Sequence, residues 1–341
     1  MKQFPANSVH APEIYGDFWF NSEPLTIHAM HGQVILLCFW DYTSNASLQM
    51  MQYVQEWHRR YSDIGLVVIG VHSPEFSFGR DPKLVEATIQ RLNLQFPVAT
   101  DNTLMLHDAY RVQELPTICL IERDGSIYLT HPGEGAYEQT ERAIQTLLRE
   151  AGFHGELPLL MELSRTEEFS SFHRPTPMIR TGYLHGSLGN VEGYSPELPA
   201  EYSDAQMYVE GKFYAEGNWL AKNDAFEYKG VANAGYVTVR YSGNNVSAVI
   251  AASKKGAIVQ VLQDDKALAT EERGDDISVD EHGNTVVIVN EPKLFHIVRN
   301  KDFGDHIVKI IPSEKGTALY SFTFGAVSIL NDAAKKSYRN N

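Results

Sequence analysis

The pattern of hydrophobic and polar residues changes near residue 152. Before this point, apolar runs such as Val34–Trp40 and 66–71 alternate with stretches whose apolar residues recur at helical spacing. A continuous apolar run predicts a strand covered on both faces, and helical spacing predicts an amphipathic helix. The other predicted elements are helices over 48–61, 82–92 and 136–150 and a hairpin of strands over 116–122 and 126–130. Residues 1–152 are therefore expected to form an α/β domain in three layers.

The rest of the chain is richer in short strand-like runs. Residues 153–204 contain five prolines and predict a connecting arm, and residues 332–341 predict a polar tail. The runs between these two segments are separated by Gly, Asn and Asp, and they are MYVEGKFY, GYVTVRY, VSAVIA, AIVQVL, TVVIV, KLFHIV, HIVKII and ALYSFTF. Many short strands at this spacing predict a β-sandwich of jelly-roll type over residues 205–331.

Composition narrows the class of protein. The apolar fraction of 43% is typical of a globular protein, and the net charge of −14 without a Lys/Arg stripe argues against nucleic acid as a partner. No apolar run reaches the roughly 18–20 residues that span a bilayer, and the N-terminus lacks the apolar core of a secretory signal. We therefore expect no membrane segment and a cytoplasmic location. No metal-ligand pattern is found, so no metal and no other cofactor is expected.

The chain has two cysteines, Cys38 and Cys119, and both lie in apolar runs. This context predicts buried free thiols rather than a disulfide framework. Because the two cysteines fall on strands expected to be neighbours, a cryptic redox pair is the alternative interpretation.

The segment Phe39–Trp40–Asp41–Tyr42–Thr43–Ser44–Asn45–Ala46–Ser47 follows a predicted buried strand and opens a predicted helix. A hydroxyl at this place accepts a hydrogen bond from the first helical turn, so Ser44 is expected to be the helix N-cap. A nucleophilic Ser44 would need a nearby base, and no G-x-S-x-G pattern surrounds it. Ser47 is expected to be a small packing residue within the first turn.

Several separated segments, in the same order, resemble the thioredoxin-like region of the DipZ family. They are APEIYGDFWFNSEPLTI, HGQVILLCFWDYTSNAS, GLVVIGVHSPEF, FPVATDN, ELPT and HPGEGAYEQTE. This family comprises membrane-tethered thiol–disulfide proteins related to TlpA and the redoxins. Its thioredoxin-like domain is followed by a jelly-roll domain resembling carbohydrate-binding modules. The resemblance implies an α/β thioredoxin-like three-layer domain followed by an all-β jelly-roll domain.

The chain departs from this family at the redox centre. Where the family pattern is FW-x-Y-x-C-x-x-C, Ser44 and Ser47 occupy the two cysteine positions. A serine hydroxyl cannot form a disulfide, so the resemblance does not extend to dithiol chemistry. Cys38 stands where thioredoxins often have a buried acid, which fits a site without redox work. We therefore expect a degenerate site and no dithiol–disulfide oxidoreductase activity.

The resemblance also implies a role in peptide binding for the loop Leu115–Pro116–Thr117. Pro116 matches the proline that is cis in thioredoxin-like folds, so the Leu115–Pro116 bond is expected to be cis. In the family this loop faces the redox corner and pairs with a substrate's extended backbone. The leading hypothesis is thus a peptide or protein recognition module, or scaffold, without catalysis. The alternatives are thiol chemistry through the two cysteines and carbohydrate binding by the second domain.

Four residues are expected to flank the serine corner at the surface: Asp41, Tyr42, His72 and Glu75. Tyr42 is the preferred contact for a partner, whereas Trp40 is expected in the core. His72 and Glu75 are interpreted as a hydrogen-bonded structural pair, with a proton relay or half a metal site as the alternative.

Aromatic residues in the second domain allow two interpretations. Trp219 and the tyrosines on predicted strands are first expected in the sandwich core, and sugar stacking is the alternative. These tyrosines are Tyr208, Tyr214, Tyr228, Tyr236 and Tyr241. Asp264, Asp265, Asp275 and Asp276 are expected in solvated turns rather than around calcium, because no D-x-D-x-D-G ladder is present.

Overall fold

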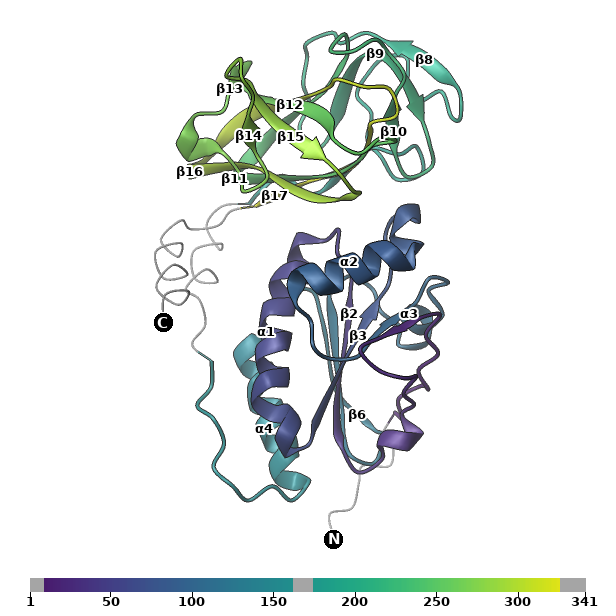
Figure 1. Ribbon diagram of the computed structural model, residues 1–341, viewed down its shortest axis with the longest axis vertical. Coiled ribbons are helices and arrows are strands. Elements are labelled where there is room, and N and C mark those ends of the chain that lie inside the picture. The colour runs from purple at the N-terminus through teal and green to yellow at the C-terminus, as the bar shows by residue number, and fades with distance from the viewer. Residues whose placement is uncertain (1–8, 162–173, 326–341) are drawn as a thin grey trace. The chain divides into compact units, whose positions relative to one another are not determined.

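The computed structural model describes residues 9–161 and 174–325 and divides the chain into two compact units, Met1–Leu163 and Ser164–Asn341 (Figure 1). The first unit contains a sheet with helices, and the second contains strands with one short 3₁₀ turn, Thr270–Glu272. The predicted tail over residues 332–341 lies outside the described residues. Each unit is described separately below.

The first unit is built on a six-stranded sheet in the order β1-β4-β3-β2-β5-β6. Strands β2, β3 and β4 are parallel, whereas β1, β5 and β6 run antiparallel to their neighbours. The strands are β1 (Trp19–Phe20), β2 (Val34–Trp40), β3 (Leu66–His72), β4 (Val98–Thr100), β5 (Thr117–Ile121) and β6 (Ile127–Pro132). All seven residues of β2 are buried, because both faces of this central strand are covered.

Helices cover this sheet on both sides, which gives the three layers expected from the sequence. Long helices α1 and α4 lie on one face and short α3 on the other (Figure 1). The α-helices are α1 (Asn45–Tyr61), α2 (Pro82–Leu92), α3 (Met105–Ala109) and α4 (Tyr137–Glu150). The 3₁₀ helices are η1 (His28–Met30), η2 (Ser62–Ile64) and η3 (Ser77–Arg80). The two hydrophobic cores are centred on Trp57 and Phe39, one on each face.

Strand register brings four loops to one edge of this sheet. Trp40 at the end of β2 pairs with His72 at the end of β3, and His72 pairs with Thr100 at the end of β4. On the other side of β2, Phe39 pairs with Thr117 at the start of β5. The serine corner, the loops after β3 and β4, and the Pro116 loop therefore meet at the same edge.

The second unit forms an 11-stranded, hydrogen-bonded sheet around one hydrophobic core. Its main path is β14-β15-β12-β16-β11-β17-β10-β9-β8, with β13 joined to β12 and β7 to β17. The strands are β7 (Ile179–Arg180), β8 (Pro199–Tyr202), β9 (Phe213–Ala221), β10 (Phe226–Tyr228), β11 (Tyr236–Ala251), β12 (Ala257–Gln263), β13 (Lys266–Ala267), β14 (Ser278–Val279), β15 (Thr285–Val289), β16 (Lys293–Pro312) and β17 (Ala318–Gly325). The domain is all-β, as expected, and its jelly-roll type stays a prediction.

Two of these strands are longer than the sequence indicated. The runs GYVTVRY and VSAVIA both lie in β11, and KLFHIV and HIVKII both lie in β16. Register shifts occur in β11 between Gly243 and Asn245 and again between Val246 and Ser247, and Gly243 pairs with Gly304 of β16. The Gly, Asn and Asp residues that suggested turns therefore belong to a bulged strand pair that continues past them.

The predicted arm over residues 153–204 is too long, because its second half belongs to the second unit. Ile179 of β7 and Tyr202 of β8 are buried in the core of that unit, and β7 pairs with β17. Prolines suggested an irregular segment, but Pro199 is the first residue of β8, the edge strand of the main path. An edge strand tolerates proline there, because the missing N–H is not needed by a neighbouring strand.

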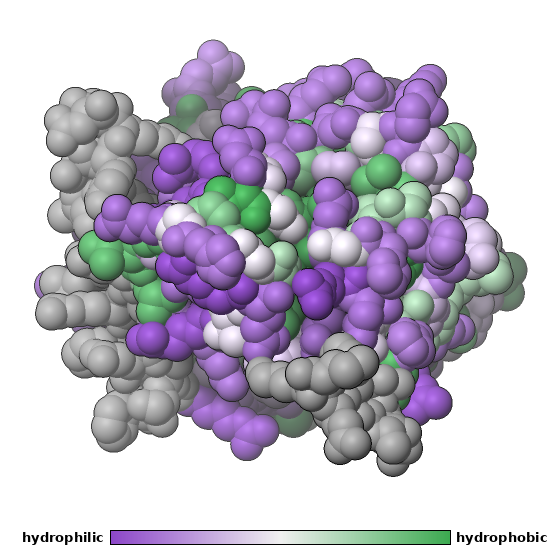
Figure 2. All heavy atoms as spheres, turned by 90° about the horizontal axis from the view of Figure 1, so that it is seen from below, coloured by the Kyte–Doolittle hydropathy of each residue, from purple (hydrophilic) through white to green (hydrophobic). Residues whose placement is uncertain are grey.

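Within the described residues, no helix is long and apolar enough to cross a membrane. Hydrophilic residues dominate the face shown in Figure 2, and hydrophobic residues form small areas among them. This surface agrees with the acidic composition of the chain.

Candidate functional site

The serine corner begins where β2 ends and α1 starts. Ser44 has extended backbone angles, and its Oγ accepts a hydrogen bond from Ser47 N–H at 3.2 Å, so Ser44 is the N-cap of α1. Ser47 is fully buried, and its Oγ accepts from Asp41 N–H at 3.2 Å. Both hydroxyls therefore accept backbone hydrogen bonds within the corner itself.

Asp41 is a buried carboxylate that connects two loops. Its Oδ1 accepts from Thr43 N–H at 2.9 Å, and its Oδ2 accepts from the Thr43 hydroxyl and from Glu75 N–H, each at 2.8 Å. Burial favours the neutral acid, but the His72 imidazole and the Thr43 and Glu75 N–H groups outweigh it and hold the pKa of Asp41 below its usual value. Asp41 thereby ties the serine corner to the loop after β3.

His72 lies beside this carboxylate among aromatic rings. Its Nε2 is 3.4 Å from Asp41 Oδ1, and the side chain is fully buried. The ring stacks on Tyr42 with centroids 5.1 Å apart and meets Trp40 edge-on at 5.3 Å. The buried carboxylate and imidazole thus have aromatic rings on two sides.

The flanking residues expected at the surface are mostly in the interior. Asp41, Tyr42 and His72 are each 1% exposed or less, and only Glu75 is half-buried. His72 is close to the side chain of Asp41, whereas Glu75 joins this group through its backbone N–H. Burial follows from packing of the loop after β3 over the corner, where Phe78 contacts the Tyr42 ring. Tyr42 is therefore a core residue, as Trp40 is.

The Pro116 loop lies opposite the serine corner in the sheet register. The Leu115–Pro116 peptide bond is cis. Pro116 is buried, and its carbonyl accepts from Gly133 N–H at 2.8 Å; the Thr117 hydroxyl donates to the Glu114 carbonyl at 2.7 Å. Leu115 is half-buried, and within residues 9–161 its N–H and C=O form no backbone hydrogen bond. One residue of this loop therefore keeps free backbone hydrogen-bonding groups.

Asp101 is a further buried carboxylate at this edge, and the sequence reasoning missed it. Its Oδ1 accepts from Leu106 N–H at 3.0 Å and its Oδ2 from His107 N–H at 2.8 Å, so Asp101 caps the start of α3. The Ser73 hydroxyl also points to Oδ2 at 3.4 Å. The signal was present in FPVATDN, where an acid directly follows a short apolar strand and precedes a helical turn.

The two cysteines are buried free thiols that face opposite sides of the sheet. Cys38 pairs with Ile118, and Cys119 pairs with Leu37 one position further along β2. Neighbouring residues of a strand point to opposite faces, and the two thiols indeed lie in different cores. Burial raises the pKa of both, that of Cys119 to about 11. Side chains on opposite faces are poorly placed for a direct disulfide, which speaks against the alternative of a cryptic redox pair.

In the second unit, most aromatic candidates are core residues. Trp219, Tyr214, Tyr228 and Tyr241 are buried, as the primary interpretation expected. The half-buried pair is Tyr208 and Tyr236, whose hydroxyls both donate to Asp204.

Each of the four predicted turn aspartates contacts a His, Lys or Arg side chain. Asp264 contacts His306, Asp265 contacts Lys309, Asp275 contacts Arg299 and Asp276 contacts Lys293. Within residues 9–161 and 174–325, no group of three or more His, Cys, Asp or Glu side chains could hold a metal ion.

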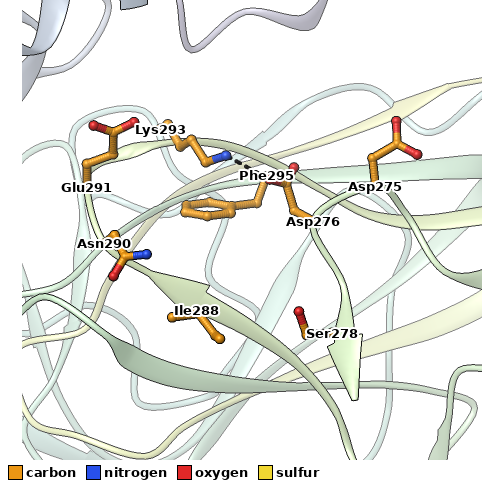
Figure 3. A pocket seen from close by; sticks show the side chains of 8 residues that line it. All are labelled: Asp275, Asp276, Ser278, Ile288, Asn290, Glu291, Lys293 and Phe295. Carbon is orange, nitrogen blue, oxygen red and sulfur yellow. Dashed lines mark hydrogen bonds and ion pairs between the residues drawn. The ribbon is translucent and has the colours of Figure 1, made fainter. Parts of the chain in front are cut away.

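A cavity of about 330 Å³ lies beside β14, β15 and β16 (Figure 3). Lys293 Nζ bonds Asp276 Oδ1 at 2.7 Å and lies 4.7 Å from the ring centroid of Phe295. The lining residues are Asp275, Asp276, Ser278, Ile288, Asn290, Glu291, Lys293 and Phe295. The cavity thus combines hydrogen-bonding groups of both kinds with an aromatic ring and one aliphatic side chain.

Two protein families match the chain, one in each unit. Residues 9–130 match the AhpC/TSA family, and residues 182–325 match the family described as thioredoxin like C-terminal domain. The second match begins near β7, in agreement with the structural boundary rather than with the predicted arm.

Some relatives cover most of the chain and others cover little more than a third of it. The DipZ proteins of Mycobacterium bovis and Mycobacterium tuberculosis are 26% identical over 324 residues, which is 92% of this chain and 43% of theirs. The chain therefore spans less than half the length of these relatives. A thiol-disulfide oxidoreductase ResA of Halalkalibacterium halodurans is 27% identical over 130 residues, covering 38% of this chain and 70% of ResA.

Two solved structures illustrate the similarity, and each covers less than half of this chain. A putative thiol:disulfide interchange protein DsbE from Chlorobium tepidum is 24% identical, covers 41% of this chain and 96% of its own, and gives a TM-score of 0.36. A thioredoxin-like superfamily protein is 23% identical, covers 44% of this chain and 99% of its own, and gives 0.40. The first unit is thus similar to the AhpC/TSA family and to thiol-disulfide oxidoreductases such as ResA, and the second unit is similar to the family described as thioredoxin like C-terminal domain.

Proposed function

We propose that the first unit uses the thioredoxin-like fold to recognise an extended peptide, without dithiol chemistry. The observation that supports this proposal most directly is that Ser44 and Ser47 stand at the positions of the family's cysteine pair. Both hydroxyls accept backbone hydrogen bonds within the serine corner. The only two thiols of the chain lie on opposite faces of the sheet. We therefore expect no dithiol–disulfide exchange by a cysteine pair of this chain.

The Pro116 loop supports peptide binding. Leu115 is half-buried and keeps its backbone N–H and C=O free of backbone partners within the described part of the first unit. These are the groups that pair with an added extended strand, and pairing of this kind needs no chemical step. The loop and the serine corner lie on neighbouring strands, β5 and β2, at one edge of the sheet.

Binding of an unfolded polypeptide tests this proposal. The probe is fluorescent, S-alkylated insulin B chain, titrated with the full chain and followed by anisotropy. Leu115→Arg places a long charged side chain at the loop, and we expect it to weaken binding at least about tenfold, or 1.4 kcal/mol. Leu159→Arg is the matched control, because Leu159 is 89% exposed in the segment after α4. Equal affinities of the two variants, or no binding by the parent, would contradict the proposal.

Carbohydrate binding by the second unit is a second candidate, favoured by the cavity in Figure 3. An aromatic ring together with amide, hydroxyl and carboxylate groups suits a ligand rich in hydroxyls. Affinity electrophoresis of the full chain in gels containing soluble polysaccharides tests it. We expect retardation that Asn290→Ala with Ser278→Ala abolishes, with Ser253→Ala as the control outside the cavity. Identical mobility in every gel would contradict this candidate.

A further inference from the structure

Asp41 and His72 are ionisable residues that peptide recognition does not itself require. Both are buried beneath the serine corner, and His72 Nε2 lies 3.4 Å from Asp41 Oδ1. Within residues 9–161, neither ring nitrogen of His72 has a hydrogen-bond partner, so its contact with Asp41 is one of charge and proximity. Burying two such groups together is costly, and a well-packed apolar pair often serves stability as well. Their presence at the edge where the candidate site lies therefore calls for a specific role.

The Asp41 carboxylate connects the serine corner to the loop after β3 through hydrogen bonds. It accepts two hydrogen bonds from Thr43 in the serine corner and one from Glu75 N–H after β3. An ionised carboxylate accepts all three without bringing a donor, whereas a protonated oxygen would add an O–H group that needs an acceptor of its own. The negative charge of Asp41 thus strengthens the contacts that join the two loops.

His72 is placed to balance that charge. Its ring stacks on the face of Tyr42, where an aromatic ring favours a cation, and its Nε2 approaches the carboxylate. A positive imidazole therefore compensates the buried anion, whereas a neutral imidazole leaves the anion with hydrogen bonds alone.

The other titratable groups near His72 are few. Cys38 lies two positions before Trp40, on the same face of β2, and burial raises the pKa of its thiol so that it carries no charge. From the loop after β4, Asp101 reaches Ser73 and the start of α3. The loop after β3 contributes Glu75, and the aromatic rings that pack against the pair belong to Trp40, Tyr42 and Phe78.

We propose that Asp41 and His72 form a proton-sensitive lock that holds the serine corner against the loop after β3. With both side chains charged, the two loops are held together. When the pH rises and His72 loses its proton, the corner loosens, and its surface becomes less ordered for a peptide. The link to peptide recognition rests on the proposed function, but the lock itself is testable without a peptide.

Nuclear magnetic resonance of the full chain tests the lock directly. The pH is varied from about 5 to 8, the range in which histidine changes charge. We expect the amide signals of Thr43 and Glu75 to move with one shared midpoint, which is also the midpoint of the His72 ring signals. Asp41→Asn removes the opposite charge, so the shared midpoint should move to lower pH. Asp101→Asn, which removes an equally buried carboxylate from the next loop, should lower it less.

Three results would overturn the lock. They are a His72 ring that does not titrate, Thr43 and Glu75 amides that do not follow it, and equal midpoints in Asp41→Asn and the parent. His72→Phe keeps a stacked ring without charge, so both amide transitions should vanish in it; if that variant does not fold, His72→Gln replaces it. A lock without binding of the insulin B chain would refute the peptide proposal alone, and binding without a transition would refute the lock alone.

Discussion

At the scale of single residues, the thiols give the most direct prediction. Cys38 and Cys119 are 1% exposed or less, and burial raises the pKa of both, so little reactive thiolate is available. We expect native alkylation by iodoacetamide at pH 8 to be at least about a hundredfold slower than in denaturant. Mass spectrometry of the labelled chain measures both rates. Rapid native labelling, or a Cys38–Cys119 disulfide under oxidation, would contradict this account.

Asp41 gives a prediction about stability and pH. Its pKa is lower in the folded protein than in the unfolded chain, so its contribution is complete above the unfolded value of about 3.9 and is lost as the pH falls through the folded value. Asp41→Asn should therefore lower the free energy of unfolding by about 1–3 kcal/mol at neutral pH, and by less in acid.

Urea unfolding of the parent and of Asp41→Asn, at neutral pH and near the unfolded pKa, measures this difference. Asp124→Asn is the control, since Asp124 caps only the turn before β6. A penalty that does not shrink in acid would show that Asp41 acts by shape rather than by charge.

The capping role of Ser44 could be predicted from the sequence, but the burial of the residues around the serine corner could not. The place of Ser44 as helix N-cap followed from its type and from the strand before it. Asp41, Tyr42 and His72 were expected at the surface because polar residues at strand ends usually face water. Their burial depends on the loop after β3, which folds over them, and a single strand–helix pattern holds no information on that contact.

At the scale of elements, the length of a helix or strand decided whether the sequence could predict it. The strand Val34–Trp40 and the helix Pro82–Leu92 occur with the predicted bounds, because each has a clear apolar pattern and the helix has proline at its start. The sequence did not predict the short elements β1, β4 and α3, which have two, three and five residues. Their positions come from pairing and capping rather than from periodicity.

A buried carboxylate on α4 gives a prediction at this scale. Glu141 accepts from the Tyr61 hydroxyl and from Met161 N–H, both at 2.7 Å, and is 1% exposed. Gln145 adds a bond to the Pro158 carbonyl at 2.8 Å. These bonds hold the segment after α4 against α1 and α4. Glu141→Ala should therefore make the Met161 amide exchange with solvent at least about tenfold faster, a loss of roughly 1.4 kcal/mol.

Hydrogen exchange of the full chain measures this effect. Glu138→Ala is the matched control, because Glu138 lies on the same helix and pairs with Arg142 at the surface. Unchanged exchange of Met161 in Glu141→Ala would show that packing of Leu157 and Met161 suffices to hold the segment.

At the scale of the whole molecule, the order of two domains was predictable and their boundary was not. The change from mixed to purely strand-like patterns indicated the order of an α/β unit and an all-β unit. The segment with β7 and β8 was assigned to an arm because strand pairing far along the chain, such as that of Ile179 with Phe322, leaves no local pattern. The cavity beside β14–β16 was also beyond reach, since its residues come from separate segments.

The central proposal is that this chain, which is similar to thiol-disulfide oxidoreductases, lacks their dithiol chemistry. Reduction of insulin disulfides with dithiothreitol tests it most directly, comparing the parent, Ser44→Cys alone, and Ser44→Cys with Ser47→Cys. We predict that the parent and the single variant give only the background rate of dithiothreitol, and that the double variant is clearly faster. Reduction of insulin by the parent would contradict the account, because it would require a reactive thiol where the structure places none.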